Sequence, residues 1–226
     1  MEEIQNNAHV NVSNDTILKV FFRMFLGLLA TGITAFYVYS SGMYLTIMSG
    51  APLAVVALIE LVVVLVFTFL FKKLSPLAVT ILFYLYAFIN GITLSVIFAM
   101  FNIDSIFYAF FTTALLFGAL AVYGYTTKKD MSKLGTILMV GLIVGIIVSI
   151  VNIFLGSSLI SLIIDWAMLA VFCGLTVYDI NRIKMIGEEI GCESEKLYIY
   201  GAMELYLDFI NIFIRILSIF GNIKRN

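Results

Sequence analysis

Long apolar stretches, separated by short polar connections, run along almost the whole chain. Seven of them are about 20 residues long and cover 17–40, 52–71, 77–98, 105–126, 134–155, 160–181 and 197–220. A helix of this length crosses the hydrocarbon core of a bilayer. Backbone polar groups in lipid must be satisfied within their own segment, so continuous apolar stretches predict helices rather than the alternating strands of a barrel. The pattern predicts an all-α integral membrane protein with seven transmembrane helices.

The residues outside these stretches are too few for a separate soluble domain. A polar tail at 1–16 precedes the first stretch, and a short tail at 222–226 follows the last. The first stretch is too long for the apolar core of a signal peptide, so we interpret it as a retained span. We therefore expect a single seven-helix transmembrane domain over 17–221.

The composition agrees with this pattern and excludes several classes of protein. Hydrophobic residues make up 62% of the chain and charged residues 12%, whereas soluble domains average about 45–50% and about 25%. The net charge of −1 excludes a polybasic nucleic-acid binder, so the expected surroundings are a lipid bilayer. The single histidine, His9, lies in the polar tail, and Cys173 and Cys192 lack the spacing of metal ligands. We expect no bound cofactor.

Lysine and arginine predict how the spans are oriented. They flank the start of the first span and follow the second, fourth and sixth spans, at Lys19, Arg23, Lys72, Lys73, Lys128, Lys129, Lys133, Arg182, Lys184 and Lys196. The loops at 41–50, 99–104 and 156–159 contain neither residue. The positive-inside rule then places the N-terminus in the cytoplasm. Lys224 and Arg225 do not fit, and charge counting leaves open whether the last segment crosses or is re-entrant.

Apart from the charges at the start of the first stretch and in the loops and tails, six ionisable residues are embedded in the apolar stretches: Glu60, Asp165, Asp179, Glu204, Asp208 and Arg215. Each costs about 2.5–3.5 kcal/mol at a helix centre on insertion scales, so such residues are expected to face protein or water. Glu60 is roughly 12 Å along the second span, near the midplane. A structural hydrogen-bonding role and a role in an ion path fit this position equally well. Asp165 stands beside Trp166 near the outer end of its span, and we interpret it as a solvated interface residue.

The last helix carries a polar stripe, which we define as Glu204, Asp208, Asn211 and Arg215. Their spacings of 4, 3 and 4 place them on one helical face. Such a face cannot point into lipid, so the helix is expected to be surrounded by protein or to line a wet cavity, which favours a full span. The stripe is compatible with a polar seam that holds the bundle together, assisted by Tyr206. Arg215 would then neutralise Asp208 or Glu204.

Asp179, near the cytoplasmic end of the sixth span, has Arg182 three residues later as one potential charge partner. The sixth and seventh helices are joined by a short link, so Asp179 and Asp208 can meet. Two close carboxylates share one proton, because both cannot be ionised at low dielectric cost, and their titration belongs to the pair. The protonated pair locks two helices, whereas the deprotonated pair repels and offers hard oxygen ligands to calcium. This chemistry predicts a pH-gated cation path.

Two segments closely resemble a known family. Residues 205–217 (LYLDFINIFIRIL) match the C-terminal signature of the Bax inhibitor-1 family, and 178–184 (YDINRIK) resemble its sixth-helix segment. Weaker similarities lie at 91–94 (GITL), 128–130 (KKD) and 152–154 (NIF). The resemblance covers nearly the whole chain and is greatest to bacterial members, which implies a location in the inner, or plasma, membrane.

The resemblance implies seven helices, with the last one central and wrapped by two groups of three. It also implies a pH-sensitive calcium leak governed by Asp179 and Asp208, with Glu60 lining the path. In the family a basic residue at the end of the second helix latches onto the sixth-helix aspartate. Here Phe71 stands eleven residues after Glu60, and Lys72 follows. A lysine in that role lacks the planar fork of arginine.

Two other functions compete with the leak. The family is also tied to cytoprotection and protein quality control, so a regulatory membrane protein that binds a membrane protease or stress-response partners is the alternative. An aspartate in each of two neighbouring helices also resembles presenilin-type proteases. However, Asp208 follows Leu205, Tyr206 and Leu207 where those enzymes have glycines that admit substrate, and their later proline-alanine-leucine motif is missing. We therefore expect no enzymatic activity.

Overall fold

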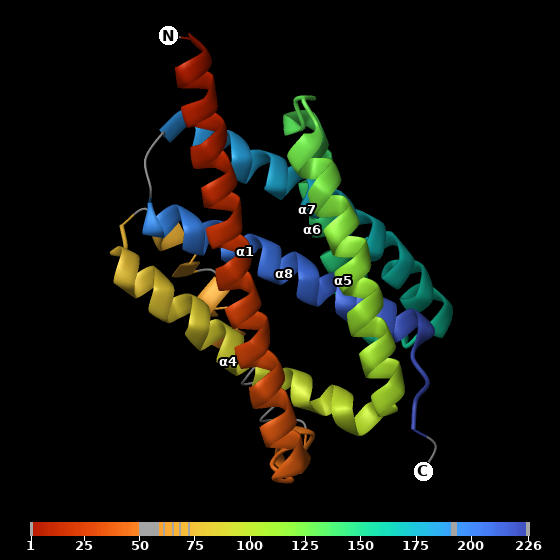
Figure 1. Ribbon diagram of the computed structural model, residues 1–226. Helices are drawn as coiled ribbons and strands as arrows, with labels where there is room; N and C mark the ends of the chain where they lie inside the picture. Colours follow the sequence, from red (N-terminus) through yellow and green to blue (C-terminus); the bar gives the residue numbers. More distant parts are fainter. Residues whose placement is uncertain are drawn as a thin grey trace. The chain divides into compact units, whose positions relative to one another are not determined.

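The computed structural model describes residues 2–49, 59–60, 62–64, 66–67, 69–71, 73–190 and 194–224, with backbone alone at 2–14 and 188–190. The helices are α1 (Glu2–Ser40), α2 (Tyr44–Ile47), α4 (Pro76–Met100), α5 (Ile103–Thr126), α6 (Ser132–Leu155), α7 (Ser158–Ile190) and α8 (Glu195–Phe220) (Figure 1). One isolated bridge joins Phe101 to Ile223. The all-α prediction is confirmed for the described residues.

Among the described residues, five helices are long and apolar enough to cross a membrane: Asp15–Ser40, Pro76–Met100, Ile103–Thr126, Ser132–Leu155 and Ser158–Gly187. They coincide with the predicted spans 17–40, 77–98, 105–126, 134–155 and 160–181. The second predicted span, 52–71, lies largely outside the described residues, although those described between 59 and 70 are helical. The seventh predicted span, 197–220, coincides with α8, a helix of 26 residues. Because it carries charged side chains, α8 is not among these five apolar helices.

Local signals explain where the helices begin and end. Ser75 caps α4, because its side chain accepts a hydrogen bond from the Ala78 amide at 3.3 Å, and Pro76 fills the first turn, where no amide donor is needed. Gly156 ends α6 in the left-handed conformation with φ 62°, which a residue without Cβ adopts freely. α1 begins earlier than the predicted span, since the polar residues 2–14 continue the same helix.

The chain divides into two compact units. Unit 1 comprises Met1–Ile17, Phe107–Cys192 and Leu207–Gly221, and unit 2 comprises Leu18–Ile106, Glu193–Tyr206 and Asn222–Asn226. α8 is a single helix that gives its first part to unit 2 and the remainder to unit 1.

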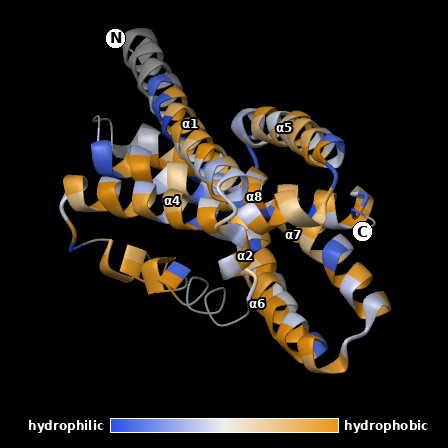
Figure 2. Cartoon of the chain, turned by 90° about the horizontal axis from the view of Figure 1, so that it is seen from below, coloured by the Kyte–Doolittle hydropathy of each residue, from blue (hydrophilic) through white to orange (hydrophobic). Residues whose placement is uncertain are grey.

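In unit 1, α6 packs along α7 (Figure 1). Glycines allow the close approach, because a Cβ on Gly135 would lie 2.5 Å from the Tyr178 ring and one on Gly145 would lie 2.1 Å from Met168 Sδ. Only Gly135 and Asn152 of α6 are buried, and its remaining surface is almost wholly apolar (Figure 2). A surface of this kind is suited to contact with lipid tails.

In unit 2, the two ends of α8 lie at opposite ends of α1 and α4. At its start, Arg23 Nη2 donates to Glu195 Oε2 at 2.6 Å, and Lys196 Nζ donates to the Leu74 carbonyl at 2.9 Å. Beyond its end, Lys224 Nζ donates to the Phe98 carbonyl at 2.8 Å, and the Lys224 amide donates to the Met100 carbonyl at 2.9 Å. A re-entrant segment would bring both of its ends back to the same side, so α8 runs the full length of its neighbours.

Candidate functional site

α8 is buried along almost its whole length, and only Glu195, Ser218 and Phe220 among its residues are exposed. The polar stripe predicted this burial, since a face with three charged residues is expected to be surrounded by protein. Within the stripe, Asp208 is fully buried, and the other three residues are partly buried. Asn211 donates to the Leu207 carbonyl of its own helix at 2.8 Å.

Asp179 on α7 and Asp208 on α8 are both buried within unit 1, with exposed fractions of 6% and 4%. Asp208 lies close enough to α7 to act electrostatically on Cys173, which precedes Asp179 on the same helix. Two acidic side chains are therefore enclosed on two neighbouring helices of one unit. Asp179 is thus enclosed by protein, and its pairing with Arg182 stays a prediction. That the two carboxylates share a proton or bind calcium stays a prediction.

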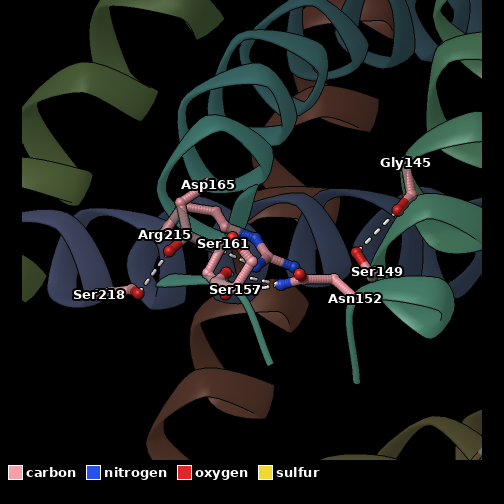
Figure 3. A network of polar contacts seen from close by, with 8 residues as sticks. All are labelled: Gly145, Ser149, Asn152, Ser157, Ser161, Asp165, Arg215 and Ser218. Carbon is pink, nitrogen blue, oxygen red and sulfur yellow. Dashed lines mark hydrogen bonds and ion pairs between the residues drawn. The ribbon is translucent and has the colours of Figure 1, made fainter. Parts of the chain in front are cut away.

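Asp165 is the main correction to the sequence-based interpretation. It is 8% exposed rather than solvated. Arg215 Nη1 donates to Asp165 Oδ1 at 2.6 Å, and Ser218 Oγ donates to Asp165 Oδ2 at 2.6 Å (Figure 3). The charge partner of Arg215 is thus Asp165 on α7, and not Asp208 or Glu204 on its own helix.

The Asp165 cluster, which we define as Asp165, Arg215 and Ser218, lies next to a second polar group (Figure 3). Asn152 near the end of α6 donates to Ser161 Oγ on α7 at 2.8 Å and to the Ser157 carbonyl at 3.2 Å. This contact closes the turn between α6 and α7. Ser161 and Asp165 are one helical turn apart, so polar contacts fix both α6 and α8 to the first turns of α7.

The other end of α7 is held to α5. Asn181 Nδ2 donates to the Gly124 carbonyl at 3.4 Å and to the Thr127 carbonyl at 3.3 Å. Lys184 Nζ donates to the Tyr125 carbonyl at 3.0 Å. These contacts satisfy carbonyls at the end of α5 that have no partner within the helix. Arg182 lies between the two donors and is partly buried.

Glu60 belongs to a polar network within unit 2. Thr93 Oγ1 donates to Glu60 Oε1 at 2.9 Å, and Asn90 Nδ2 donates to the same oxygen at 3.4 Å. The fully buried Tyr206 donates its hydroxyl to Asn90 Oδ1 at 3.1 Å and lies 2.7 Å from Thr31 Oγ1. Glu60 therefore contacts α4 directly, and Asn90 extends the network to Tyr206 on α8 and Thr31 on α1. These contacts support the interpretation of Tyr206 as part of a polar seam.

Sequence reasoning did not find Thr31, Asn90 or Asn152 as members of these networks, because neutral polar residues are common in membrane spans. For Asn90 and Asn152 the only signal was their position beside or in the short family-like segments at 91–94 and 152–154, and Thr31 had no such signal. Lys72, the predicted latch residue, lies outside the described residues. Glu204 is partly buried on α8, and its place in an ion path stays a prediction.

The family model for inhibitors of apoptosis-promoting Bax1 matches residues 13–226. The chain belongs to the Bax inhibitor-1 family. It is 39% identical to the inner membrane protein YbhL of Escherichia coli K12 over 210 residues, 90% of each chain. It is 33% identical to a protein of Borreliella burgdorferi over 227 residues, 98% of this chain and 97% of that one. A membrane protein of Streptococcus pyogenes is 37% identical over 166 residues, 73% of this chain and 72% of its own.

Membership of the Bax inhibitor-1 family and the apolar helices together identify a membrane protein. The family match covers both units, including the Asp165 cluster, both buried aspartates and Glu60. Chemically, this arrangement offers enclosed carboxylates that can hold a proton or a hard cation.

Proposed function

We propose that this Bax inhibitor-1 family protein is a passive, pH-sensitive calcium leak of the inner membrane, with its N-terminus in the cytoplasm and no enzymatic activity. Asp179 and Asp208 form the gate by sharing a proton. Glu60 and Glu204 are further acidic residues of the calcium path. Lys72 or Arg182 supplies the positive charge that holds the closed state.

The observation that carries this proposal is the burial of Asp179 and Asp208 in one unit, on helices that the Asp165–Arg215 ion pair joins. Ionised carboxylates are costly in a low-dielectric interior, so a buried pair retains a proton more readily than exposed residues do. When the pair holds that proton, α7 and α8 are joined. When the proton is lost, the two charges repel and the freed oxygens attract calcium. The flux is therefore expected to rise as the pH increases through the titration of the pair.

Purified protein in liposomes loaded with a calcium-sensitive dye tests the proposal. We expect calcium entry above that of empty vesicles, suppressed by acidification, and Asp208→Asn should remove the suppression. The proposal fails if the parent protein and Asp208→Asn both leave calcium entry at the level of empty vesicles. In that case the alternative, a regulatory protein that acts through membrane protein partners, is favoured.

A further inference from the structure

The Asp165 cluster pairs a carboxylate with a guanidinium, whereas the proposed gate consists of two carboxylates. Arginine keeps its proton at any physiological pH, and its planar guanidinium suits a carboxylate partner. Asp165 accepts hydrogen bonds on both oxygens, and its side chain is 11% exposed. The Arg215 side chain, however, is 25% exposed. The guanidinium is thus paired with Asp165, while part of the Arg215 side chain is exposed.

The position of this ion pair matters because Arg215 is the only basic member of the polar stripe. It follows Asp208 by seven residues, roughly 10 Å along α8. Asp165 precedes Asp179 by fourteen residues, roughly 21 Å along α7. The ion pair therefore lies in the first turns of α7 and toward the end of α8, whereas Asp179 lies in the second half of α7 and Asp208 near the middle of α8.

We propose that the Asp165–Arg215 ion pair determines the charge selectivity of the path at this end. Asp165 neutralises the one fixed positive charge on the stripe, so the stripe presents a net acidic surface to a divalent cation. Ser218 positions the carboxylate for this pairing. This inference rests on the proposed leak. It assigns charge selectivity to the ion pair, a role that the gating aspartates do not supply.

The electrostatic role makes a prediction that a purely structural clamp does not. Asp165→Asn leaves an uncompensated guanidinium, which repels calcium. Arg215→Gln leaves an uncompensated carboxylate, which attracts calcium. The two variants should change calcium flux in opposite directions, each by roughly tenfold, since the field in a low-dielectric site concentrates or excludes ions by such factors. If the pair were only a clamp, both variants would loosen the same contact and shift the flux in the same direction.

Three matched variants complete the design. Arg215→Lys keeps the positive charge, so any change in flux should come without a shift of the reversal potential. Ser218→Ala removes one hydrogen bond to Asp165 but no charge, so it should shift the reversal potential less than either charge variant does. The exchanged pair, Asp165→Arg with Arg215→Asp, restores neutrality and should return the flux toward the parent value. This double variant keeps the inference testable if one of the single variants fails to fold.

The measurement is calcium entry into liposomes at mildly alkaline pH, together with the reversal potential in a potassium chloride gradient. We expect Asp165→Asn to shift the reversal potential toward anions and Arg215→Gln to shift it toward cations. Shifts of the same sign in both variants, or no shift in either, with a leaking parent protein would overturn the inference and leave the proposed function intact. A parent protein that does not leak more than empty vesicles would overturn both.

Discussion

Individual carboxyl groups in this protein differ sharply in what they can sense. Asp130 lies in the exposed connection between α5 and α6, and the Ser132 amide donates to its Oδ1 at 2.9 Å. The Ser132 hydroxyl and amide together hold the pKa of Asp130 below its usual range, so the contribution of this contact is lost only as the pH falls through that lowered pKa. Asp130 is therefore ionised throughout the neutral range and cannot act as a sensor there.

This difference allows a test of the gate with a matched control. Asp179→Asn should weaken the pH dependence of calcium flux and leave the fold intact, because a neutral amide can keep a hydrogen bond in place of the shared proton. Asp130→Asn removes an acidic residue of the same type and should leave the neutral-range profile unchanged. Flux is measured in liposomes across the neutral range. Equal pH sensitivity of the parent protein and Asp179→Asn would argue against the shared proton.

Tyr206 provides a second prediction, for stability. Tyr206→Phe keeps the ring but removes the hydroxyl that donates to Asn90 and lies beside Thr31. A buried acceptor that loses its donor costs about 1–3 kcal/mol, so the variant should unfold at a lower denaturant concentration in detergent. Tyr108→Phe is the control, since Tyr108 is 75% exposed. A parent-like midpoint for Tyr206→Phe would show that the network contributes little.

Pairs of helices show how far prediction from sequence can go. The limits of α4 and α6 follow from residues that can be read directly, Ser75 and Pro76 at one start and Gly156 at one end. The partner of Arg215 could not be predicted in this way. Spacing identifies neighbours on the same helix, whereas the register of α8 against α7 depends on side-chain packing and brings Asp165 into contact from 50 positions away. The contacts that join Thr31 and Asn90 to Tyr206 could not be predicted for the same reason, since they also depend on the register between helices.

The packing of α1 on α4 depends on one close approach. A Cβ on Gly91 would lie 2.7 Å from both the Thr31 carbonyl oxygen and Thr34 Cβ, so Gly91→Ala must separate the two helices. Overpacking of this kind costs about 1–3 kcal/mol, and the detergent-solubilised variant should melt at a lower temperature.

Gly32→Ala on α1 is the matched control for this prediction, because its Cβ would meet nothing within 4 Å. That substitution should be neutral or slightly stabilising, since alanine favours helix over glycine by about 1 kcal/mol. Equal melting temperatures for the two variants would contradict the contact between α1 and α4.

For the molecule as a whole, the course of α8 predicts where the C-terminus emerges. The chain after α8 lies with the ends of α1 and α4, at Lys224, Tyr39 and Phe98, and not with Arg23 at the other end of α1. With the N-terminus in the cytoplasm, the C-terminus should then be outside. The excess charge of Lys224 is accommodated there by the Phe98 carbonyl and the Tyr39 hydroxyl.

Cysteine labelling tests this topology in a background that carries Cys173→Ser and Cys192→Ser. A membrane-impermeant maleimide should label Asn222→Cys on intact cells, whereas Asp130→Cys, on the predicted cytoplasmic side, should react only after the cells are opened. Protection of Asn222→Cys in intact cells and its labelling in opened cells would mean that the C-terminus returns to the cytoplasm.

The burial of α8 also bears on biosynthesis. This helix leaves the ribosome after the helices that it contacts, yet its acidic and basic side chains disfavour its insertion into lipid by itself, and it is not among the five helices apolar enough to cross a membrane. Its entry must therefore be favoured by partners already in the bilayer, such as Asp165 for Arg215 and Asn90 for Tyr206. Until α8 arrives, those partners have unmet polar groups. A chain that stalls before Glu195 would leave these polar groups without their partners on α8. We expect membrane quality control to degrade such a chain.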